Sequence, residues 1–386
     1  MPKAPSPIQW FPPAETKIPL LALTHLLHSN VQFTTNKICL QINSAHCLLG
    51  PNGRALLFNL LAGLYKECGR TRNEVLLPAY TCYSVAAAVV KAGLRIRLYD
   101  LNSETFEPIT ASFEKNCNTN TLAVISQHLM GIPSNVEDIA AVAESEGFSH
   151  IEDAAQALGG RFKEKHLGTT GDYGLFSFGR GKPLPLGSGG ALISNRINLK
   201  ELPVAFSYSS GWKALSVTLL SQIIAYPYLY GIAENLPLGL GKTVFDPDFE
   251  IKKIPRRLIS LLAPMLSCLE KLNKHRLAIA SVYQQILPSS HTISYHNAAV
   301  PVYPRFPVVA KPGPLPKDLI RIGIRRLYPK SLNQEMPITP YILNLDDKFP
   351  GAEHLAERLI SLPTHHFIDS KIAEFIGEKI KNWINS

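Results

Sequence analysis

Three side chains in the middle of the chain could act on one substrate. Asp153 ends an apolar segment that runs up to Ile151, and Ser177 and Lys182 follow on a later stretch rich in glycine. A lysine amine can form a Schiff base with an aldehyde, and an aspartate can keep a pyridine nitrogen protonated so that the ring accepts electrons. The serine hydroxyl could bind a phosphate oxygen. Together these residue types predict a site for pyridoxal phosphate.

Each of these residues also has a simpler interpretation on its own. A lysine beside glycines usually belongs to a surface loop, and an acid at the end of a strand is usually solvated or acts as a cap. Only the combination favours a cofactor site. Ala154 and Ala155 leave room above the predicted sheet edge, which suits a flat ring, and Gln156 follows them.

Two more stretches could contribute to the same site. Gly53 and Arg54 open a predicted helix, where free backbone N–H groups can bind phosphate. The turn before them differs from a nucleotide-binding P-loop because no Gly-Lys-Ser/Thr ending follows, and taken alone it is more often only a turn. In the loop after residue 78, Tyr80 or Tyr83 could stack on a pyridine ring, although ordinary core packing fits both equally well.

The elements that would position these residues follow a regular alternation. Apolar patterns predict strands over 74–78, 94–100, 122–126 and 150–152, and helices over 55–65, 84–91 and 136–146. Such alternation indicates a parallel α/β sheet, whose sites lie at the carboxyl ends of the strands. Asp153 falls at one of those ends.

The remainder of the chain is organised differently. Residues 1–45 form an irregular N-terminal arm, and its proline-rich start lacks the apolar run of a signal peptide. We place a large domain over 46–250 and a smaller one over 251–386. A leucine-rich face after Lys252 predicts a long helix, and the last helix is expected over 372–383.

Composition limits the class of protein. The chain has 386 residues, 46% of them hydrophobic, which suffices for two domains with their own cores. Its net charge of +9 fits anionic substrates or a membrane surface, or simply a basic exterior. Basic residues are not interleaved with aromatics, so nucleic-acid binding is not expected. The six cysteines form no CxxC pair and no zinc spacing, so we expect a reducing cytoplasm, no disulfide framework and no metal site.

An uncharged segment over 214–233 stands out within the large domain. Twenty residues are enough for one membrane-spanning helix, but Pro227 and several polar residues weaken that interpretation. Burial in the core or in a dimer interface, docking on a membrane surface, and spanning a membrane all remain open. The tyrosines and the flanking Trp212 and Lys213 motivate the hypothesis of peripheral contact with the inner membrane surface through 212–233.

The central motifs resemble those of a known family, the DegT/StrS-type sugar aminotransferases. Glu152 to Ala157 matches the family's EDAAQA run, 168–178 resembles its GTxGDxGxFSF run, and Lys182 follows Ser177 by five residues as the family lysine does. The segments beginning at His128 and Leu359 are similar to its HLYG and LSLP motifs. The match over 121–191 is specific, and the outer parts match loosely.

This resemblance implies a fold, a cofactor and a role for each residue. The fold is the fold-type-I arrangement of pyridoxal phosphate enzymes, with a mostly parallel seven-stranded sheet flanked by helices and a smaller α+β C-terminal domain. Lys182 would be the Schiff-base lysine and proton shuttle, and Asp153 would pair with the pyridinium nitrogen. Gln156 would lie near the ring hydroxyl. Ser177 and the amides of Gly53 and Arg54 would hold the phosphate.

Several positions depart from the family pattern. Gly53 and Arg54 replace its hydroxyl residues, and the Arg54 guanidinium could compensate as a two-pronged phosphate ligand. Cys82 stands where the family has its stacking ring, so Tyr80 or Tyr83 must serve. The family's Asn-Tyr-Arg segment, which reaches the partner subunit's site, would fall near 245–249 but is missing from this chain.

The resemblance also implies an activity. We expect an aminotransferase of polysaccharide or amino-sugar biosynthesis that acts on a keto-sugar carried by a nucleotide or related group. Glutamate is the expected amino donor, and a homodimer is the expected assembly. The alternatives are a sugar dehydratase of the same fold, in which the family's lysine is replaced by histidine, and a non-catalytic, membrane-associated regulatory or scaffold protein.

Overall fold

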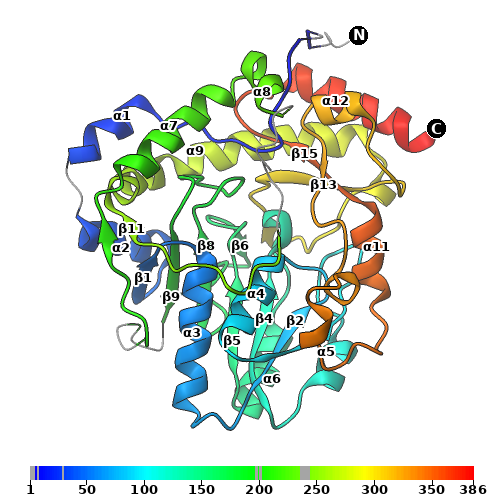
Figure 1. Cartoon of the computed structure of the whole chain (residues 1–386). Coiled ribbons are helices and arrows are strands. Elements are labelled where there is room, and N and C mark those ends of the chain that lie inside the picture. The colour runs from blue at the N-terminus through cyan, green and yellow to red at the C-terminus, as the bar shows by residue number, and fades with distance from the viewer. Residues whose placement is uncertain (1–4, 7, 28–29, 196–198, 200–201, 235–243) are drawn as a thin grey trace.

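A central sheet of seven strands organises the large domain. The computed structural model describes residues 5–6, 8–27, 30–195, 199, 202–234 and 244–386. In that part of the chain the seven strands follow the order β1-β9-β8-β5-β4-β2-β3 (Figure 1). They are β1 (His46–Gly50), β2 (Glu74–Pro78), β3 (Arg95–Tyr99), β4 (Thr121–Gln127), β5 (Ser149–Asp153), β8 (Tyr173–Ser177) and β9 (Gly190–Ser194).

The direction of these strands confirms the predicted, mostly parallel sheet. The pairs from β3 through β2, β4 and β5 to β8 are all parallel. Only β9 runs the other way, antiparallel to both β1 and β8. The carboxyl ends of β5 and β8 therefore meet at one edge, as the position of Asp153 in the sequence predicted.

Helices connect the parallel strands where the apolar periodicity placed them. They are α3 (Gly53–Glu67), α4 (Tyr83–Lys91), α5 (Thr110–Asn116) and α6 (Glu137–Glu146). The Asn52 side chain caps α3 by accepting the Ala55 N–H at 2.8 Å. Gly147, with φ of 66°, ends α6 in the left-handed conformation that favours glycine. The sequence predicted every one of these helices except the short α5.

The C-terminal part forms a smaller layer of mixed structure. Three antiparallel strands lie in the order β13-β15-β14. The elements are α9 (Arg256–Ile286), β13 (Arg305–Val309), α10 (Lys317–Arg321), β14 (Arg325–Arg326), α11 (Pro350–Arg358), β15 (Leu359–Pro363) and α12 (Ser370–Asn385). The long helix and the last helix were both predicted from their apolar faces.

Short elements complete the described chain. Two-residue strands form two small sheets, β10 (Tyr208–Ser209) with β11 (Ile254–Pro255), and β6 (Arg161–Phe162) with β7 (Lys165–His166) and β12 (Ala299–Val300). Single 3-10 turns lie at Thr24–Leu27, Leu129–Gly131, Ser289–His291, Leu332–Gln334 and Thr339–Tyr341. None of these short elements was predicted.

Helix α9 joins the two predicted domains. Its first half, including Leu262 and Leu266, belongs to one buried cluster with Phe176 and Phe178 of the large domain. Its second half, around Tyr283, belongs to the other cluster, which continues into the C-terminal layer. The boundary that the sequence suggests near residue 250 lies just before this shared helix.

The first 45 residues do not form the irregular arm that the sequence suggested. They contain α1 (Leu20–Leu23) and α2 (Val31–Ile42), and α2 packs along α9. Residues 10–18 form an ordered strap: the Phe11 N–H donates to the Arg321 carbonyl at 2.8 Å, and His365 Nε2 contacts the Pro12 carbonyl at 2.8 Å. Residues 1–4, at the start of the arm, lie outside the described residues.

The uncharged segment folds into two helices, α7 (Trp212–Ile224) and α8 (Pro227–Glu234). One face of the pair is exposed, including Leu220 (55%), Ile223 (60%) and Ile232 (65%). The prediction that this segment is buried in the core is therefore wrong for that face. Within the described residues no single helix has the length and apolar character to cross a membrane. The pair α7 and α8 passes the same criteria together, with a 110° bend between them.

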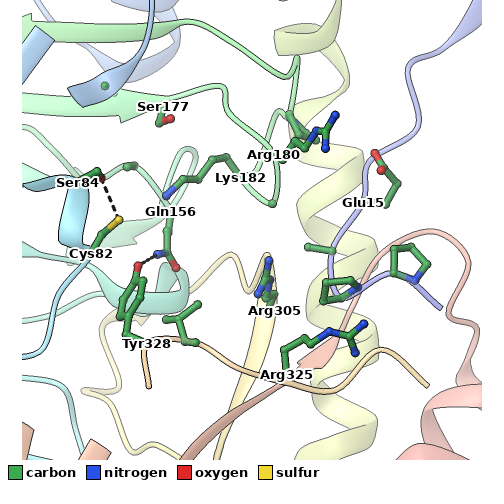
Figure 2. A pocket seen from close by; sticks show the side chains of 18 of the residues that line it. Glu15, Cys82, Ser84, Gln156, Ser177, Arg180, Lys182, Arg305, Arg325 and Tyr328 are labelled. Atoms are coloured by element: carbon green, nitrogen blue, oxygen red, sulfur yellow. Dashed lines mark hydrogen bonds between the residues drawn. The ribbon is translucent and has the colours of Figure 1, made fainter. Parts of the chain in front are cut away.

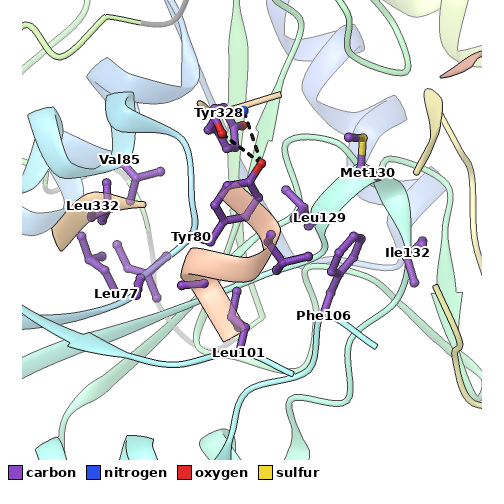
Figure 3. Close-up of a cluster of buried hydrophobic side chains, with 14 of the residues drawn as sticks. Leu77, Tyr80, Val85, Leu101, Phe106, Leu129, Met130, Ile132, Tyr328 and Leu332 are labelled. Atoms are coloured by element: carbon purple, nitrogen blue, oxygen red, sulfur yellow. Dashed lines mark hydrogen bonds between the residues drawn. The ribbon is translucent and has the colours of Figure 1, made fainter. Parts of the chain in front are cut away.

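A buried tyrosine ties the C-terminal layer to the sheet. Tyr80, fully buried, lies among apolar side chains such as Leu77, Leu101 and Leu129 (Figure 3). Its hydroxyl donates to the Tyr328 carbonyl and accepts the Tyr328 N–H, each at 3.3 Å. Tyr80 therefore acts as a core residue that anchors the Tyr328 segment.

A buried arginine on α9 holds the strap against the loop that follows Lys182. Arg276 donates to Thr16 Oγ1 at 2.7 Å, to the Pro183 carbonyl at 2.8 Å and to Asn273 Oδ1 at 2.6 Å. Burial lowers its pKa to about 10, which leaves the side chain charged at neutral pH. Every contact of this buried cation is thus to an uncharged acceptor.

We expect Arg276→Met to lower the free energy of unfolding by about 3 kcal/mol, because it leaves buried acceptors without donors. Urea denaturation followed by circular dichroism measures the change. Arg256→Met, on the same helix but exposed, is the matched control and should change stability by less than about 0.5 kcal/mol. Equal effects of the two substitutions would contradict this account.

Candidate cofactor site

A cavity of about 1000 Å³ lies at the carboxyl ends of β5 and β8. Three parts of the chain contribute the polar residues that line it. The large domain contributes Gly53, Arg54, Asp153, Gln156, Ser177 and Lys182, the strap contributes Glu15, and the C-terminal layer contributes Arg305, Arg325 and Tyr328. Figure 2 shows the Lys182 side chain reaching into this space toward Gln156. The structure therefore brings six of the seven sequence-predicted site residues to one cavity.

Asp153 lies at the end of β5 and is partly buried. Its Oδ1 accepts the Ala155 N–H at 3.0 Å. Burial raises the pKa of Asp153, and the nearby charge of Lys182 and the Ala155 hydrogen bond oppose that rise. A second cation in contact with this carboxylate would lower its pKa further. The site is therefore suited to a positively charged ring nitrogen.

The neighbouring Glu152 has a structural role. Its Oε2 accepts from His128 Nε2 and from the Gly168 N–H, both at 2.9 Å, and its Oε1 accepts the N–H groups of Thr170 and Gly171. Because His128 Nδ1 accepts the Ser134 N–H at 3.1 Å, the proton of this ring lies on Nε2. Glu152 thereby fixes the loop before β8, and Asp153 points to the opposite side of the strand.

These hydrogen bonds set the ionisation of Glu152. Burial alone would raise its pKa, but the hydrogen bond from His128 and the Gly171 N–H outweigh it and bring the pKa down to about 2. The side chain is 1% exposed. A buried carboxylate at the end of β5 is thus held fully charged at neutral pH.

The start of α3 meets the end of β8 in a narrow cradle. A Cβ on Gly53 would lie 3.5 Å from Ser177 Cβ, so the two residues are adjacent. A Cβ on Gly190 would lie 2.8 Å from the Gly53 nitrogen and would close the cradle. Asn52 caps the helix by accepting the Ala55 N–H, and Gly53 and Arg54 are the first two residues of that helix. The cradle can take an anion between the amides of these two residues and the Ser177 hydroxyl.

The Arg54 guanidinium has other contacts in this chain. Its Nη1 lies 3.7 Å from Asp246 Oδ2, and its Cζ lies 4.1 Å from the centre of the Phe249 ring. The side chain therefore packs against the segment where the family's Asn-Tyr-Arg was expected.

Tyr83 is not brought to the cavity. Its hydroxyl donates to the Lys330 carbonyl at 2.9 Å, and the residue is 3% exposed. Cys82, which lies between Tyr80 and Tyr83 in the sequence, does line the cavity, and its Sγ lies 2.9 Å from Ser84 Oγ. The ring that does reach the site is that of Tyr328, whose hydroxyl accepts from Gln156 Nε2 at 3.3 Å.

Sequence reasoning missed several residues that line the cavity, and three of them are Glu15, Arg305 and Tyr328. Glu15 lies in the strap, where its Oε1 accepts from Gln222 Nε2, and burial raises its pKa. Arg305 is the first residue of β13, and a charged residue at the start of an apolar strand was the only available signal for it. Tyr328 follows Gly323 in a run without apolar periodicity. Arg305 and Tyr328 lie more than 120 residues after Lys182 in the sequence, and Glu15 lies in the N-terminal segment that was expected to be irregular.

Comparisons with known proteins bear on the family and the fold of this chain. Residues 29–219 match the model of the DegT/DnrJ/EryC1/StrS aminotransferase family. GDP-perosamine synthase of Escherichia coli O157:H7 is 30% identical over 165 residues, which cover 43% of this chain and 44% of that protein. The matched region spans less than half the length of the curated relatives.

Solved structures share the fold over nearly the whole chain. An aminotransferase of Helicobacter pylori involved in pseudoaminic acid biosynthesis superposes with a TM-score of 0.72 at 16% identity, covering 98% of this chain and 100% of its own. The E. coli GDP-4-keto-6-deoxy-D-mannose-3-dehydratase with bound hydrated PLP gives 0.73 at 16% identity, covering 97% and 100%. The fold is therefore that of fold-type-I PLP enzymes, as the sequence predicted.

We expect Glu152→Gln to lower the free energy of unfolding by on the order of 3 kcal/mol at pH 7. A carboxylate whose folded pKa is depressed stabilises the fold above its unfolded pKa, and that stability is lost as the pH falls through about 4 toward 2. The difference between the two proteins in urea denaturation should therefore shrink between pH 7 and pH 3. Exposed Glu144→Gln is the control. A difference that stays constant with pH would contradict this account.

Proposed function

We propose that this chain, whose residues 29–219 carry a domain of the DegT/DnrJ/EryC1/StrS aminotransferase family, is a pyridoxal-phosphate-dependent aminotransferase. Its proposed substrate is a keto-sugar linked to a nucleotide or related carrier, with glutamate as the amino donor. One observation carries the proposal: an amine, a carboxylate and an anion cradle line a single cavity, contributed by Lys182, Asp153 and the Gly53–Ser177 contact.

The residues of the cavity fit this cofactor. The cradle between Gly53 and Ser177 would be filled by a Cβ at Gly190, and it offers the size and the donors that a phosphate group needs. Asp153, with its raised pKa, gains most from a cationic ring nitrogen. When bound, the cofactor would supply an aldehyde carbon and an electron-accepting ring.

Each proposed site residue then has one task. Lys182 would be the attachment point for the cofactor and, once displaced by the donor amine, would move a proton between two carbon centres at its Nζ. Asp153 would hold the ring nitrogen protonated. Gln156 would orient the ring from its hydroxyl side, supported by its own contact with Tyr328. Ser177 and the amides of Gly53 and Arg54 would hold the phosphate.

The proposal also covers the organisation of the chain. The large domain over 46–250 would bind the cofactor and the small domain over 251–386 would complete the cavity, a division supported by Arg305 and Tyr328 in its lining. A cytoplasmic location is supported by the composition of the sequence. The family match begins at residue 29, inside the segment first assigned to the arm.

The exposed apolar face of α7 and α8 supports a homodimer. Leu220 and Val217, which line the cavity, are themselves about half exposed, so the cavity opens onto this face. A second copy of the chain covering the face would bury its apolar side chains and close the cavity. Contact with the inner membrane surface is the competing explanation for the same side chains.

We expect Lys182→Ala to remove both the visible absorbance of the bound cofactor and the amino transfer, because no other amine replaces Nζ at that position. Absorbance spectroscopy of the purified protein and an assay of glutamate consumption with a keto-sugar acceptor measure the two effects. Lys66→Ala, an exposed lysine on α3, should change neither. A Lys182→Ala protein that retains the band and the turnover would overturn the assignment, and elimination of a sugar hydroxyl by the wild type would favour the dehydratase.

We expect Ile223→Glu combined with Ile232→Glu to shift the protein from dimer to monomer in light scattering at micromolar concentration, because the charges would be buried at the interface. Met336→Glu, at an exposed apolar residue in a turn of the C-terminal part, should leave the dimer intact. Sedimentation with anionic liposomes at low salt tests the competing explanation. A wild-type protein that is monomeric and sediments with the liposomes would contradict the dimer and support contact with a membrane surface.

A further inference from the structure

Arg305 is a cation of the cavity that has no counter-charge in the described part of the chain. It begins β13, and among the described residues its guanidinium makes no hydrogen bond and no ion pair. Three of the other arginines that line the cavity have partners, and the charge of the fourth, Arg180, acts on Glu15. Arg325 Nη2 lies 2.8 Å from Glu234 Oε1, Arg54 contacts Asp246, and Arg326 donates to the carbonyls of Gly313 and Glu357.

The surroundings of Arg305 give it no compensation. Burial lowers its pKa, and the charge of Arg325 acts in the same direction, opposed only by the hydroxyls of Tyr328 and Tyr230. A partly buried cation without an acceptor costs free energy, so such groups usually meet an anion when the site is filled. The guanidinium fork matches the geometry of a carboxylate or a phosphate.

The position of Arg305 is close to the proposed reaction centre. A Cβ on Gly181 would lie 2.9 Å from Arg305 Nη2, so the guanidinium packs directly against the residue before Lys182. Gly181 has φ of 72° and no side chain, and both features let the arginine approach the loop. In Figure 2 Arg305 stands between Lys182 and Arg325.

We propose that Arg305 binds the α-carboxylate of the amino donor. The inference rests on the proposed function, in which the donor amine must take the place of Lys182 Nζ. In an α-amino acid the amine and the carboxylate are bonded to the same carbon, so the carboxylate has to lie next to the lysine. The diphosphate of a nucleotide-linked sugar lies beyond a whole sugar ring from the reacting carbon. The contact between Arg305 and Gly181 therefore favours the carboxylate.

The choice of residue also explains the charge balance of the cavity. Arg325 is neutralised by Glu234, and Arg180 lies near Glu15, whose carboxyl group its charge acts on. A donor carboxylate at Arg305 would give this guanidinium the counter-charge that it lacks in the described part of the chain. A neutral substrate would leave Arg305 uncompensated.

The test measures binding of glutarate, an unreactive dicarboxylate, to the cofactor-loaded protein by isothermal titration calorimetry. We expect Arg305→Gln to weaken glutarate binding about tenfold to a hundredfold, the loss typical of hydrogen bonds to a charged group. Arg305→Lys keeps the positive charge but loses the two-pronged guanidinium, so its glutarate affinity should lie between those of the wild type and Arg305→Gln. Arg95→Gln removes one positive charge outside the cavity and is the matched control, with unchanged affinity.

Pyrophosphate serves as the second probe. We expect its affinity to be the same in wild type and Arg305→Gln. Loss of pyrophosphate binding with unchanged glutarate binding would assign Arg305 to a diphosphate and overturn the inference. So would a wild type that does not bind glutarate.

The outcome is separable from the fate of the proposed function. Arg305→Gln should retain the visible cofactor band and the melting temperature of the wild type, because Arg305 touches neither the cradle nor Asp153 among the contacts described. A wild-type protein that shows no cofactor band would contradict the proposed function itself. A wild type with the band, whose glutarate affinity is unaffected by Arg305→Gln, would remove only this inference.

Discussion

The site depends on one buried carboxylate, that of Glu152. It accepts hydrogen bonds from His128 and from three amides of the loop over 168–171, so it stays ionised in the core. This arrangement locks the loop that leads into β8 and therefore the position of Ser177. Because side chains alternate along a strand, holding Glu152 on one side directs Asp153 to the other, where the cavity lies. The placement of the acid that would meet a cofactor follows from a residue that never touches it.

The cavity is closed by segments that are distant in the sequence. The Tyr80 hydroxyl holds the Tyr328 segment through the backbone N–H and carbonyl of Tyr328. Arg276 binds both the strap and the loop after Lys182. These are buried hydrogen bonds to uncharged partners, and they order loops that carry site residues. The large domain thus provides the groups for chemistry, whereas the C-terminal layer and the strap provide the charges that a substrate would meet.

Local patterns in the sequence predicted the part of the fold that local patterns determine. The strands and helices over 53–153, apart from the short α5, carry their own periodicity, and the position of Asp153 follows from them. Ser177 and Lys182 were found from the glycine-rich stretch and the family resemblance. Helix α2 was missed because Thr34 and Thr35 are poor helix formers, and it is stabilised by the Asn30 cap and by packing on α9. Only tertiary folding brings Arg305, Tyr328 and Glu15 to the cavity, so local patterns could not predict them. The Tyr83 side chain lies outside the cavity because its hydroxyl donates to the Lys330 carbonyl.

The absorbance spectrum of the purified wild-type protein, recorded before and after addition of glutamate, tests the central claim most directly. The account predicts a visible band from a cofactor bound at Lys182, and a shift of that band when glutamate delivers its amino group. A protein that shows no band after incubation with pyridoxal phosphate, or a band that glutamate leaves unchanged, would contradict the account and favour a non-catalytic member of the same fold.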